Sequence, residues 1–181
     1  MFMQFGPKII EKVFPGDLGR LILPLQYLAE TYLRLGDYNM AEPLYKRALE
    51  AQNLLQGAYH PDLAQTCFDI ADIYLELSHY KVAEEYYRKT LAIEELNLGP
   101  DHEDIALTYY NLGICNHWLE KYKIGIEFFD ESLKLSPTYE DALTWKNKSL
   151  VLLLAKINST NLSVEDGGVV NVIDVNLEGE R

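Results

Sequence analysis

A 42-residue period that runs three times constrains the fold of this chain more than any other feature of its sequence. A small residue recurs at this spacing as Ala29, Ala71 and Gly113, each preceded by a large aliphatic residue. Twelve residues later comes a second small residue, and four residues after that an aromatic one: Ala41 and Tyr45, Ala83 and Tyr87, and Gly125 and Phe129. Self-similarity on this scale predicts stacked supersecondary units, each too small to bury its own apolar face. Such arrays present a long curved surface and seldom a catalytic pocket.

Each period contains two segments with the spacing of an amphipathic helix. The first unit has an apolar stripe with i, i+3, i+4, i+7 spacing: Leu25, Leu28, Ala29 and Tyr32. Gly36 then favours a turn, because glycine readily takes the left-handed conformation that ends a helix. The pattern predicts antiparallel helix pairs at 24–35 with 38–55, 63–77 with 80–98, and 105–119 with 122–135. Gly113 and Gly125 predict a weaker third unit unless packing compensates, since glycine costs about 1 kcal/mol in a helix.

These positions resemble the tetratricopeptide repeat, whose motif runs large–x–x–large–small–x–x–aromatic, a turn, and small–x–x–x–aromatic–x–x–small. The resemblance covers residues 22 to about 136. Residues 41–50 and the linkers at 59–64 and 100–106 are similar to the 42-residue subclass typified by kinesin light chain. The resemblance implies an all-α, right-handed superhelical array of antiparallel helix hairpins, and a function in protein–protein interaction.

The repeat boundaries divide the chain into successive parts. Residues 1–21 are expected to be an N-terminal capping segment or the remnant of a preceding repeat, with a short helix at 9–14. Residues 22–137 are expected to hold three repeats, at about 22–63, 64–105 and 106–137. The third repeat ends at Pro137, as in the shorter 34-residue form of the motif.

The residues after the repeats read as a cap and a tail. We expect a capping helix at 138–158, because Lys146 and Asn147 stand where the motif requires apolar residues. Its expected packed side holds Leu143, Leu150, Leu153 and Leu154. The acidic tail, 159–181, is expected to be disordered, with a short hairpin or an added strand as the alternative.

Composition narrows the range of partners. The 181-residue chain has a formal net charge of −12, and both nucleic acids and anionic membranes require a basic surface, so neither is expected to bind. The negative charge has two interpretations: the partner is basic, or the charge only keeps the protein soluble. No apolar run reaches the ~18 residues of a membrane span, and no signal peptide is evident. Cys67 and Cys115 lie inside apolar helical patterns as reduced thiols, so we expect a cytoplasmic protein.

The sequence contains no catalytic, cofactor-binding or metal-binding motif. His60 and His102 occupy equivalent linkers and are expected to be structural turn residues. Asp62 and Asp104 are expected to cap the helices that follow. We therefore expect a protein that is not an enzyme and that holds no cofactor or metal.

The expected binding surface is the face of each first helix opposite the motif stripe, since the resemblance implies that this face lines a concave groove. Its residues are Tyr27, Glu30 and Arg34 in the first unit; Phe68, Asp69, Asp72 and Glu76 in the second; Tyr110, Asn111, Ile114, His117 and Trp118 in the third; and Trp145 of the cap. Aromatic residues among acids suit an extended peptide, or a partner helix, with apolar anchors and Lys or Arg. Alternatively, some aromatic residues, such as Tyr27 and Tyr110, bridge adjacent repeats.

One ligand of the resembling family is not expected here. Some tetratricopeptide proteins clamp the C-terminal carboxylate of heat-shock chaperones with Lys and Asn side chains. The residues of this chain at the matching positions are Gln26, Glu30, Asp69, Leu107 and Asn111. Only Asn111 fits, and the acids would repel a carboxylate.

A second function class stays open from the sequence. The chain could be a structural subunit, or a fragment of a larger multidomain tetratricopeptide protein, that assembles through the ends of the array. An exposed apolar patch near Phe14 or Leu153 would favour this alternative, whereas a solvated cap would favour a stand-alone adaptor.

Overall fold

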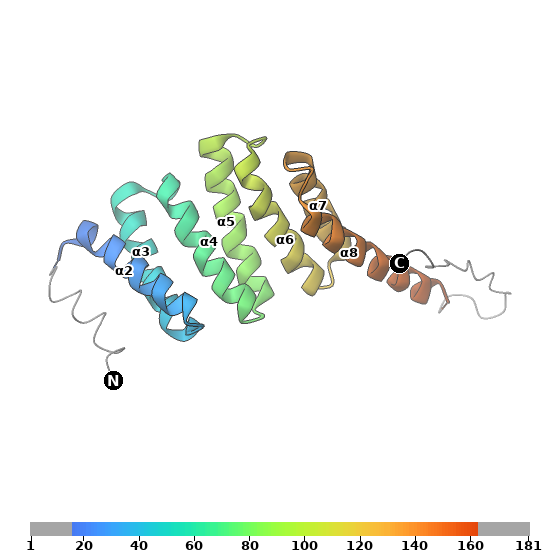
Figure 1. The fold of residues 1–181 in the computed structure, drawn as a ribbon, viewed down its shortest axis with the longest axis horizontal. Coiled ribbons are helices and arrows are strands. Elements are labelled where there is room, and N and C mark those ends of the chain that lie inside the picture. The colour runs from blue at the N-terminus through green and yellow to red at the C-terminus, as the bar shows by residue number, and fades with distance from the viewer. Residues whose placement is uncertain (1–15, 163–181) are drawn as a thin grey trace.

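The computed structural model describes residues 16–162, and all regular elements in this span are helical. They are α2 (Leu18–Arg34), α3 (Tyr38–Gln56), α4 (Pro61–Glu76), α5 (Tyr80–Leu98), the 3₁₀ helix η1 (Glu103–Ile105), α6 (Ala106–Trp118), α7 (Tyr122–Leu135) and α8 (Glu140–Leu162). Figure 1 shows a curved array in which the chain advances from one helix pair to the next. No helix of the described span is long and apolar enough to cross a membrane.

Neighbouring helices form three antiparallel hairpins. α2 packs on α3, α4 on α5, and α6 on α7. The hairpins stack through α3 with α4 and through α5 with α6, and α8 packs mainly on α7. The helix pairs expected from the 42-residue period are therefore all present.

The first helix begins earlier than the sequence suggested. α2 starts at Leu18, six residues before the expected start, because the Asp17 side chain accepts a hydrogen bond from the Arg20 backbone N–H (3.1 Å) and caps the helix. Pro24 is accommodated inside α2, where burial of the adjacent Leu25 to 1% exposure compensates for one lost backbone hydrogen bond.

The turns within the three hairpins share one conformation, although only the first contains glycine. Gly36 has a φ angle of 74°, and the residues at the same place in the next two units, Ser78 and Glu120, have φ angles of 60° and 57°. In each turn the next residue donates a backbone hydrogen bond to the carbonyl five residues earlier, as from His79 to Tyr74 (2.8 Å). These bonds satisfy helix-end carbonyls and so hold Ser and Glu in a left-handed conformation that they otherwise disfavour.

The helices that follow the linkers between hairpins are capped by histidine and not, as expected, by aspartate. Nδ1 of His60 accepts a hydrogen bond from the backbone N–H of Asp62, and His102 does the same for Asp104, each at 3.3 Å. The carboxylate of Asp62 lies in the first turn of α4, where its negative charge interacts favourably with the helix dipole. Among residues 16–162, no group of three His, Cys, Asp or Glu side chains could hold a metal ion.

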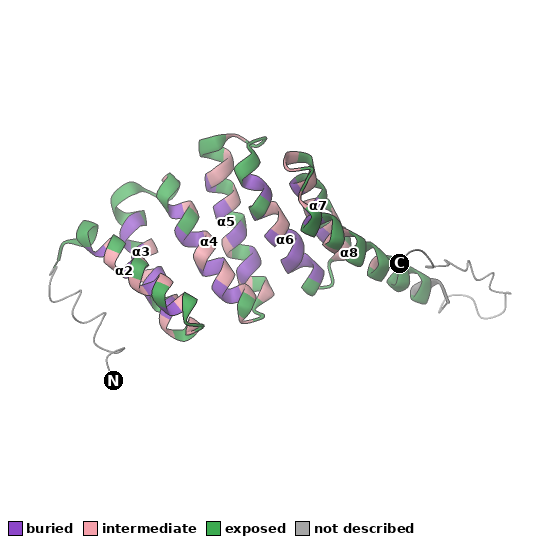
Figure 2. Ribbon diagram, in the orientation of Figure 1, coloured by how far each residue is buried: buried purple, intermediate pink, exposed green. Residues whose placement is uncertain are grey.

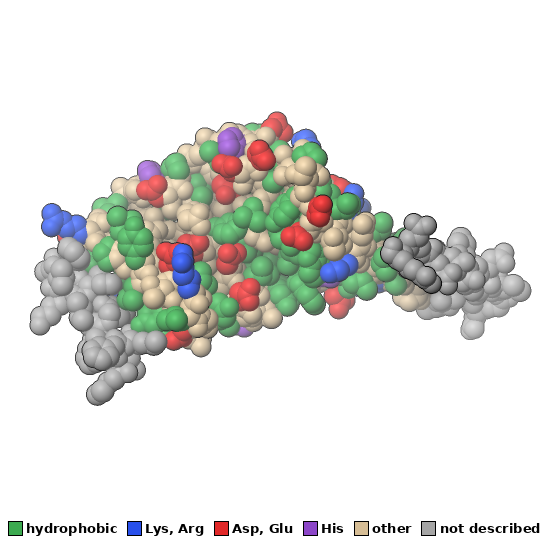
Figure 3. Space-filling model, in the orientation of Figure 1, with side chains coloured by type: hydrophobic (Ala, Val, Ile, Leu, Met, Phe, Trp, Pro, Cys, Tyr) green, Lys and Arg blue, Asp and Glu red, His purple; other side chains and the backbone are tan. Residues whose placement is uncertain are grey.

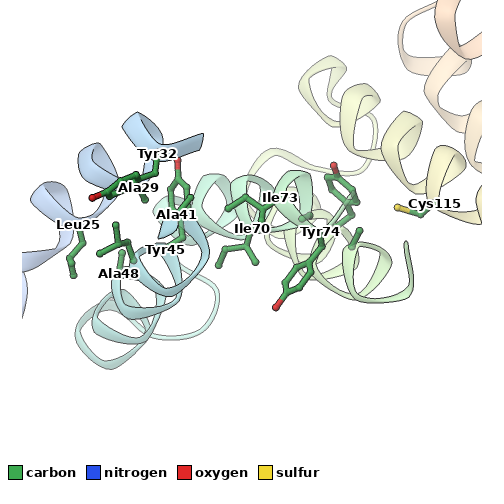
Figure 4. Packing of buried hydrophobic residues seen from close by; sticks show 14 of the residues in the cluster. Leu25, Ala29, Tyr32, Ala41, Tyr45, Ala48, Ile70, Ile73, Tyr74 and Cys115 are labelled. Atoms are coloured by element: carbon green, nitrogen blue, oxygen red, sulfur yellow. The ribbon is translucent and has the colours of Figure 1, made fainter. Parts of the chain in front are cut away.

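The motif positions form the core that joins the hairpins. The small residues at the helix crossings are all 0% exposed: Ala29, Ala41, Ala71 and Ala83. Figure 2 shows the buried residues along the facing sides of the helices, and Figure 4 shows Ala29 and Ala41 close to Tyr32 and Tyr45 where the first hairpin closes. Both cysteines are free and buried, as expected.

The third unit is tightly packed where the sequence suggested weakness. A Cβ atom at Gly113 would lie 2.4 Å from a ring carbon of Phe129, and this ring is 0% exposed. Glycine at this position therefore lets the phenyl ring pack directly against the α6 backbone. The packing compensates for the low helix propensity of the residue.

The capping helix packs by a different face from the one expected. Ala142 and Ser149 are completely buried against the preceding hairpin, and Leu153 is partly buried. Three of the four leucines expected on the packed side are exposed: Leu143 (50%), Leu150 (41%) and Leu154 (51%). The contacts with α7 and α6 select the face that contains residues 142, 149 and 153, and the leucine stripe lies beside it.

The capping helix also continues four residues past its expected end, to Leu162. The expected helix at 9–14 and the expected tail beyond residue 162 lie outside the described residues.

Candidate functional site

Two neighbouring hollows lie between α4 and α6. The first, the Asp72 hollow, has a volume of about 510 Å³ and is lined by Leu33, Tyr38, Phe68, Asp72, Leu75, Glu76, Leu107 and Asn111. The second, the Glu94 hollow, has a volume of about 400 Å³ and is lined by Pro61, Ala64, Gln65, Phe68, Ile93, Glu94, Asn97, Leu98, Asp104, Leu107 and Thr108. Phe68 and Leu107 belong to both hollows, so we treat them as one surface, the α4–α6 groove.

The α4–α6 groove carries negative charge without compensating cations. Its lining includes Asp72, Glu76, Glu94 and Asp104, and contains no Lys or Arg. None of these carboxylates pairs with a Lys or Arg side chain among the described residues. Asp104 lies 3.6 Å from Nδ1 of His102, but this nitrogen accepts a backbone hydrogen bond. Figure 3 shows Asp and Glu side chains spread among apolar ones over the middle of one face of the array.

A buried carboxylate elsewhere in the array shows the compensated arrangement. Glu84 on α5 is 7% exposed and pairs with Arg88 at 2.7 Å and with Lys121, from the turn before α7, at 3.0 Å. Although burial acts to raise it, the hydrogen bonds from Arg88 and Lys121 leave the pKa of Glu84 below its ordinary value. Glu84 thus joins two hairpins, whereas the groove carboxylates lack such partners.

Burial dominates the electrostatics of the Asp72 hollow. Asp72 is partly buried and accepts a hydrogen bond from the hydroxyl of Tyr87 on α5. Burial raises the pKa of Asp72 to about 6; the hydrogen bond from Tyr87 opposes this rise, and the charges of Asp69 and Glu76 add to it. Burial also raises the pKa of Asp69. At neutral pH the Asp72 carboxylate is therefore ionised in an environment that a ligand cation would improve.

Two oxygen atoms in the Glu94 hollow are buried without a hydrogen bond: Oε2 of Glu94 and Oγ1 of Thr108. Thr108 is only 1% exposed. Burial raises the pKa of Glu94, and the Thr108 hydroxyl lies near enough to moderate this rise without completing a hydrogen bond of normal geometry. Buried polar atoms in native proteins are nearly always paired, so this hollow has capacity to bind a hydrogen-bond donor.

Several of the predicted site residues meet in the groove. Phe68, Asp72, Glu76 and Asn111 line it, and Asp69 lies close enough to Asp72 to raise its pKa. Residues of the second unit therefore form most of the candidate site.

The predicted residues of the first unit lie outside both hollows. Tyr27 is 65% exposed on α2, and Arg34 pairs with Glu30 at 2.6 Å along the same helix. α2 contributes Leu33 to the Asp72 hollow instead.

Two residues of the third unit are covered by the capping helix. Ile114 is 7% exposed and packs with Phe129 and Ala142. His117 is also 7% exposed, and its Nδ1 atom lies 2.8 Å from Oγ of Ser149. Because α8 packs over this side of α6, these two side chains do not form an open surface.

The remaining predicted residues are aromatic and contact side chains of the second unit, the third unit and the cap. Trp118 stacks on Tyr80 with ring centroids 5.7 Å apart, contacts Trp145 at 5.9 Å, and is still 50% exposed. Tyr110 packs on Tyr139, which precedes α8, with ring centroids 4.8 Å apart. Tyr110 therefore has the bridging role that the sequence left open.

Sequence reasoning missed the part of the groove formed by Glu94, Leu107 and Thr108. Leu107 and Thr108 lie in the first turn of α6, and Glu94 lies near the C-terminal end of α5, so helix periodicity within a single element does not bring them together. The 42-residue period contains a usable signal, because Glu94 stands where the preceding unit has the neutral residue Gln52.

Comparison with known proteins agrees with this architecture. Residues 21–96 match a family model described as tetratricopeptide repeat. No curated protein matches the sequence. Among solved structures, BtubC (BKLC) from P. vanneervenii is 17% identical, with a TM-score of 0.64 over 98% of this chain and 78% of that chain.

Two further similar structures are peptide complexes. The first TPR of Spaghetti (RPAP3), bound to the HSP90 peptide SRMEEVD, is 21% identical, with a TM-score of 0.60 over 74% of this chain and 93% of that chain. The second TPR domain of human RPAP3, in complex with the HSP70 peptide SGPTIEEVD, is 19% identical, with a TM-score of 0.59 over 74% of this chain and 98% of that chain. At these identities the similarity shows the fold alone. Residues 21–96 match the tetratricopeptide repeat family model, and the array from α2 to α8 has the fold of a tetratricopeptide solenoid.

Proposed function

We propose that this chain is a cytoplasmic, non-enzymatic interaction scaffold that binds an extended peptide, or a partner helix, carrying Lys or Arg in the α4–α6 groove. The observation that carries this proposal is the row of unpaired carboxylates, Asp72, Glu76 and Glu94, in a groove with no cation of its own. Cationic side chains of a ligand would supply the missing partners. Phe68 and Leu107, which belong to both hollows, offer apolar contacts for an anchoring side chain.

The charge of the groove also separates this chain from the peptide complexes with a similar fold. The peptides in those two complexes end in the acidic sequence EEVD. A groove lined by Asp72, Glu76 and Glu94 would repel such a peptide, so we propose that this chain is not a clamp for heat-shock chaperone carboxylates. The 19-residue helices α3 and α5 and the 42-residue period support its assignment to the kinesin-light-chain-like subclass.

A library of random short peptides displayed on phage tests the proposed function. Selection on the wild-type chain is expected to enrich peptides that combine Lys or Arg with a large apolar residue. Their dissociation constants are expected near the micromolar range, which corresponds to a binding free energy of about −8 kcal/mol. Binding should weaken as salt is added, because exposed charge pairs are screened beyond about 8–10 Å at physiological ionic strength.

A pair of charge reversals locates the binding surface. Asp72→Lys with Glu76→Lys should lower the association rate of the enriched peptides about tenfold at low salt. The control reverses the same amount of charge at Glu85 on α5 and Glu127 on α7, which are exposed and line neither hollow. Circular dichroism checks that both variants fold. Absence of any enriched peptide, or equal effects of the two reversals, would count against binding in the groove.

A second candidate function, assembly through the array end, is favoured by the capping helix. Leu143, Leu150 and Leu154 are 41–51% exposed and lie within about 40° of one another around α8. In the repeat register, Leu143 and Leu150 stand where α2 has Leu25 and Tyr32, which are 1% and 3% exposed in the first hairpin. α8 therefore resembles the first helix of a hairpin whose second helix is not among the described residues.

We propose a second copy of the chain as the occupant of this stripe. Two α8 helices packed antiparallel would reproduce the pairing that each hairpin makes internally, and a two-fold axis needs only one self-complementary surface. Figure 1 shows that the C-terminal part of α8 projects beyond α7.

Sedimentation equilibrium tests this second candidate. The wild-type chain is expected to form a dimer with a dissociation constant on the order of micromolar, as for a small interface. Leu150→Glu with Leu154→Glu should leave a monomer. The control places the same change at Leu54 on α3 and Leu96 on α5, which are 75% and 67% exposed, and should leave the dimer intact. A wild-type chain that stays monomeric at its highest soluble concentration would exclude the dimer.

A further inference from the structure

The Glu94 hollow has a counterpart one unit earlier in the array. A hollow of about 480 Å³ between α2, α3 and α4 is lined by Gly19, Ile22, Leu23, Gln26, Gln52, Gln56, Asp62 and Gln65. The residue 42 positions after each of these lines the Glu94 hollow. The two hollows are therefore the same site of the repeat at successive junctions, and differences between them reflect side chains.

The polar side chains of the first junction form hydrogen bonds with one another. The Gln26 amide donates a hydrogen bond to the Thr66 hydroxyl at 2.8 Å, and this hydroxyl donates to the Gln52 side-chain oxygen at 2.8 Å. The Gln52 amide in turn donates to the backbone carbonyl of Asp62 at 3.3 Å. The network is neutral, and Gln52 and Thr66 are 2% and 0% exposed.

The second junction keeps the threonine and replaces both glutamines of the network. Thr108 stands where Thr66 is, but Phe68 replaces Gln26 and Glu94 replaces Gln52. A phenyl ring cannot donate a hydrogen bond to Thr108, and a carboxylate has no N–H with which to continue the network. The Thr108 hydroxyl lies near Glu94, but no hydrogen bond of normal geometry forms, and Oγ1 of Thr108 and Oε2 of Glu94 are both buried. Buried oxygens left in this way cost free energy unless a ligand donor reaches them.

We propose that the Glu94 hollow binds the cationic side chain of one Lys or Arg residue of the peptide held in the α4–α6 groove, an inference that rests on the proposed function. The hydrocarbon part of that side chain would lie against Phe68, Ile93 and Leu107, and its charged end would donate to Oε2 of Glu94. A cation suits the hollow better than a neutral donor, because a hydrogen bond between two charged groups is about twice as strong as a neutral one. Asp104 on the same lining adds negative charge.

Two substitutions are suggested by the chain itself. Glu94→Gln introduces the residue of the first junction, and Phe68→Gln with Glu94→Gln rebuilds its whole set of side chains around Thr108. Both variants are expected to fold, since the same arrangement already exists at Gln26, Gln52 and Thr66. Thermal unfolding checks this, and the double variant replaces the single one should Glu94→Gln alone fail to fold.

The probe is the tightest Lys-containing peptide selected from the phage library, together with copies in which norleucine replaces each Lys in turn. Norleucine keeps the hydrocarbon chain and removes the charge. Glu94→Gln should weaken binding of the Lys peptide about tenfold. For one Lys position, the copy with norleucine at that position should bind wild type and Glu94→Gln equally. Peptides with Arg and with citrulline at that position make the same comparison for a guanidinium group.

Titration of the Glu94 carboxyl carbon by NMR gives a second readout. Binding of the Lys peptide is expected to lower the pKa of Glu94, and binding of the norleucine copy is not. If the Lys peptide binds wild type and Glu94→Gln equally, the cation lies elsewhere in the groove; the subsite is then wrong and the proposed function stands. If wild type enriches no peptide at all, the proposed function itself fails.

Discussion

Gly113→Ala is expected to lower the free energy of unfolding by about 1–2 kcal/mol. The added methyl group would lie 2.4 Å from the Phe129 ring, which is completely buried and packs with Ile114 and Ala142. Overpacking of this kind typically costs 1–3 kcal/mol or more, and this exceeds the gain of about 1 kcal/mol in helix propensity. Urea denaturation of the variant measures the difference.

Two comparisons isolate the cause. Gly19→Ala, in the exposed first turn of α2, places its methyl group no closer than 3.6 Å to any atom outside its neighbours and should not destabilise the chain. Phe129→Leu should partly rescue Gly113→Ala, so that the double variant is more stable than the sum of the two changes. If Gly113→Ala is as stable as wild type, α6 and α7 do not approach as closely as described.

Asp72→Asn is expected to stabilise the chain at pH 7.5 by about 1–2 kcal/mol and to weaken binding of basic peptides. Burial raises the pKa of Asp72 from 3.8 to about 6, so its ionised form is disfavoured in the folded state. A rise of this size corresponds to at most about 3 kcal/mol, and solvent screening at a partly exposed side chain reduces the effect. Asn keeps an oxygen that can accept the hydrogen bond from Tyr87 and carries no charge.

The pH dependence gives this prediction its sign. The pKa of Asp72 is higher in the folded than in the unfolded state. Its contribution to the stability of the folded state is therefore fully present below about pH 3.8 and is lost as pH rises through about 6. The advantage of Asp72→Asn should therefore appear between pH 4 and 6 and stay constant above that range. Tyr87→Phe, which removes the opposing hydrogen bond, should lower stability at pH 7.5. An equal advantage for Asp72→Asn at pH 3 and pH 7.5 would contradict the assignment.

Together these effects describe a groove that reduces the stability of the free chain. Asp72 and Glu94 have pKa values raised by burial, and neither has a cation partner among the described residues. Sites that bind charged ligands often carry such destabilised groups. Peptide binding in the groove is therefore expected to raise the melting temperature as well.

Sequence alone was sufficient for the architecture. The apolar stripe that contains Leu25 and Tyr32 predicts a helix by its 3.6-residue period, and Gly36 predicts the turn that follows. The 42-residue repetition then predicts the same hairpin twice more. These signals are local and repeated, so they survive without knowledge of what any side chain touches.

Helix ends and packed faces could not be predicted from the local sequence pattern alone, because they depend on contacts between helices. α8 has leucines on several sides, and only its contacts with α7 and α6 show that Ala142 and Ser149 are the packed positions. The pattern also places Gly113 at the position of Ala29 and Ala71. Only the position of the Phe129 ring shows that a Cβ atom at residue 113 would overpack.

The sequence by itself determined the helix hairpins, their order and the residues at each crossing, because each of these follows from spacing along the chain. Only the tertiary structure decided which carboxylates are available to a ligand. Glu84 and Glu94 lie on the same helix and look alike in the sequence, yet Glu84 pairs with Arg88 and Lys121 and Glu94 faces a hollow with no cation. A carboxylate is neutralised by groups that approach it in space, and for Glu84 one of them, Lys121, comes from the next hairpin, 37 residues away.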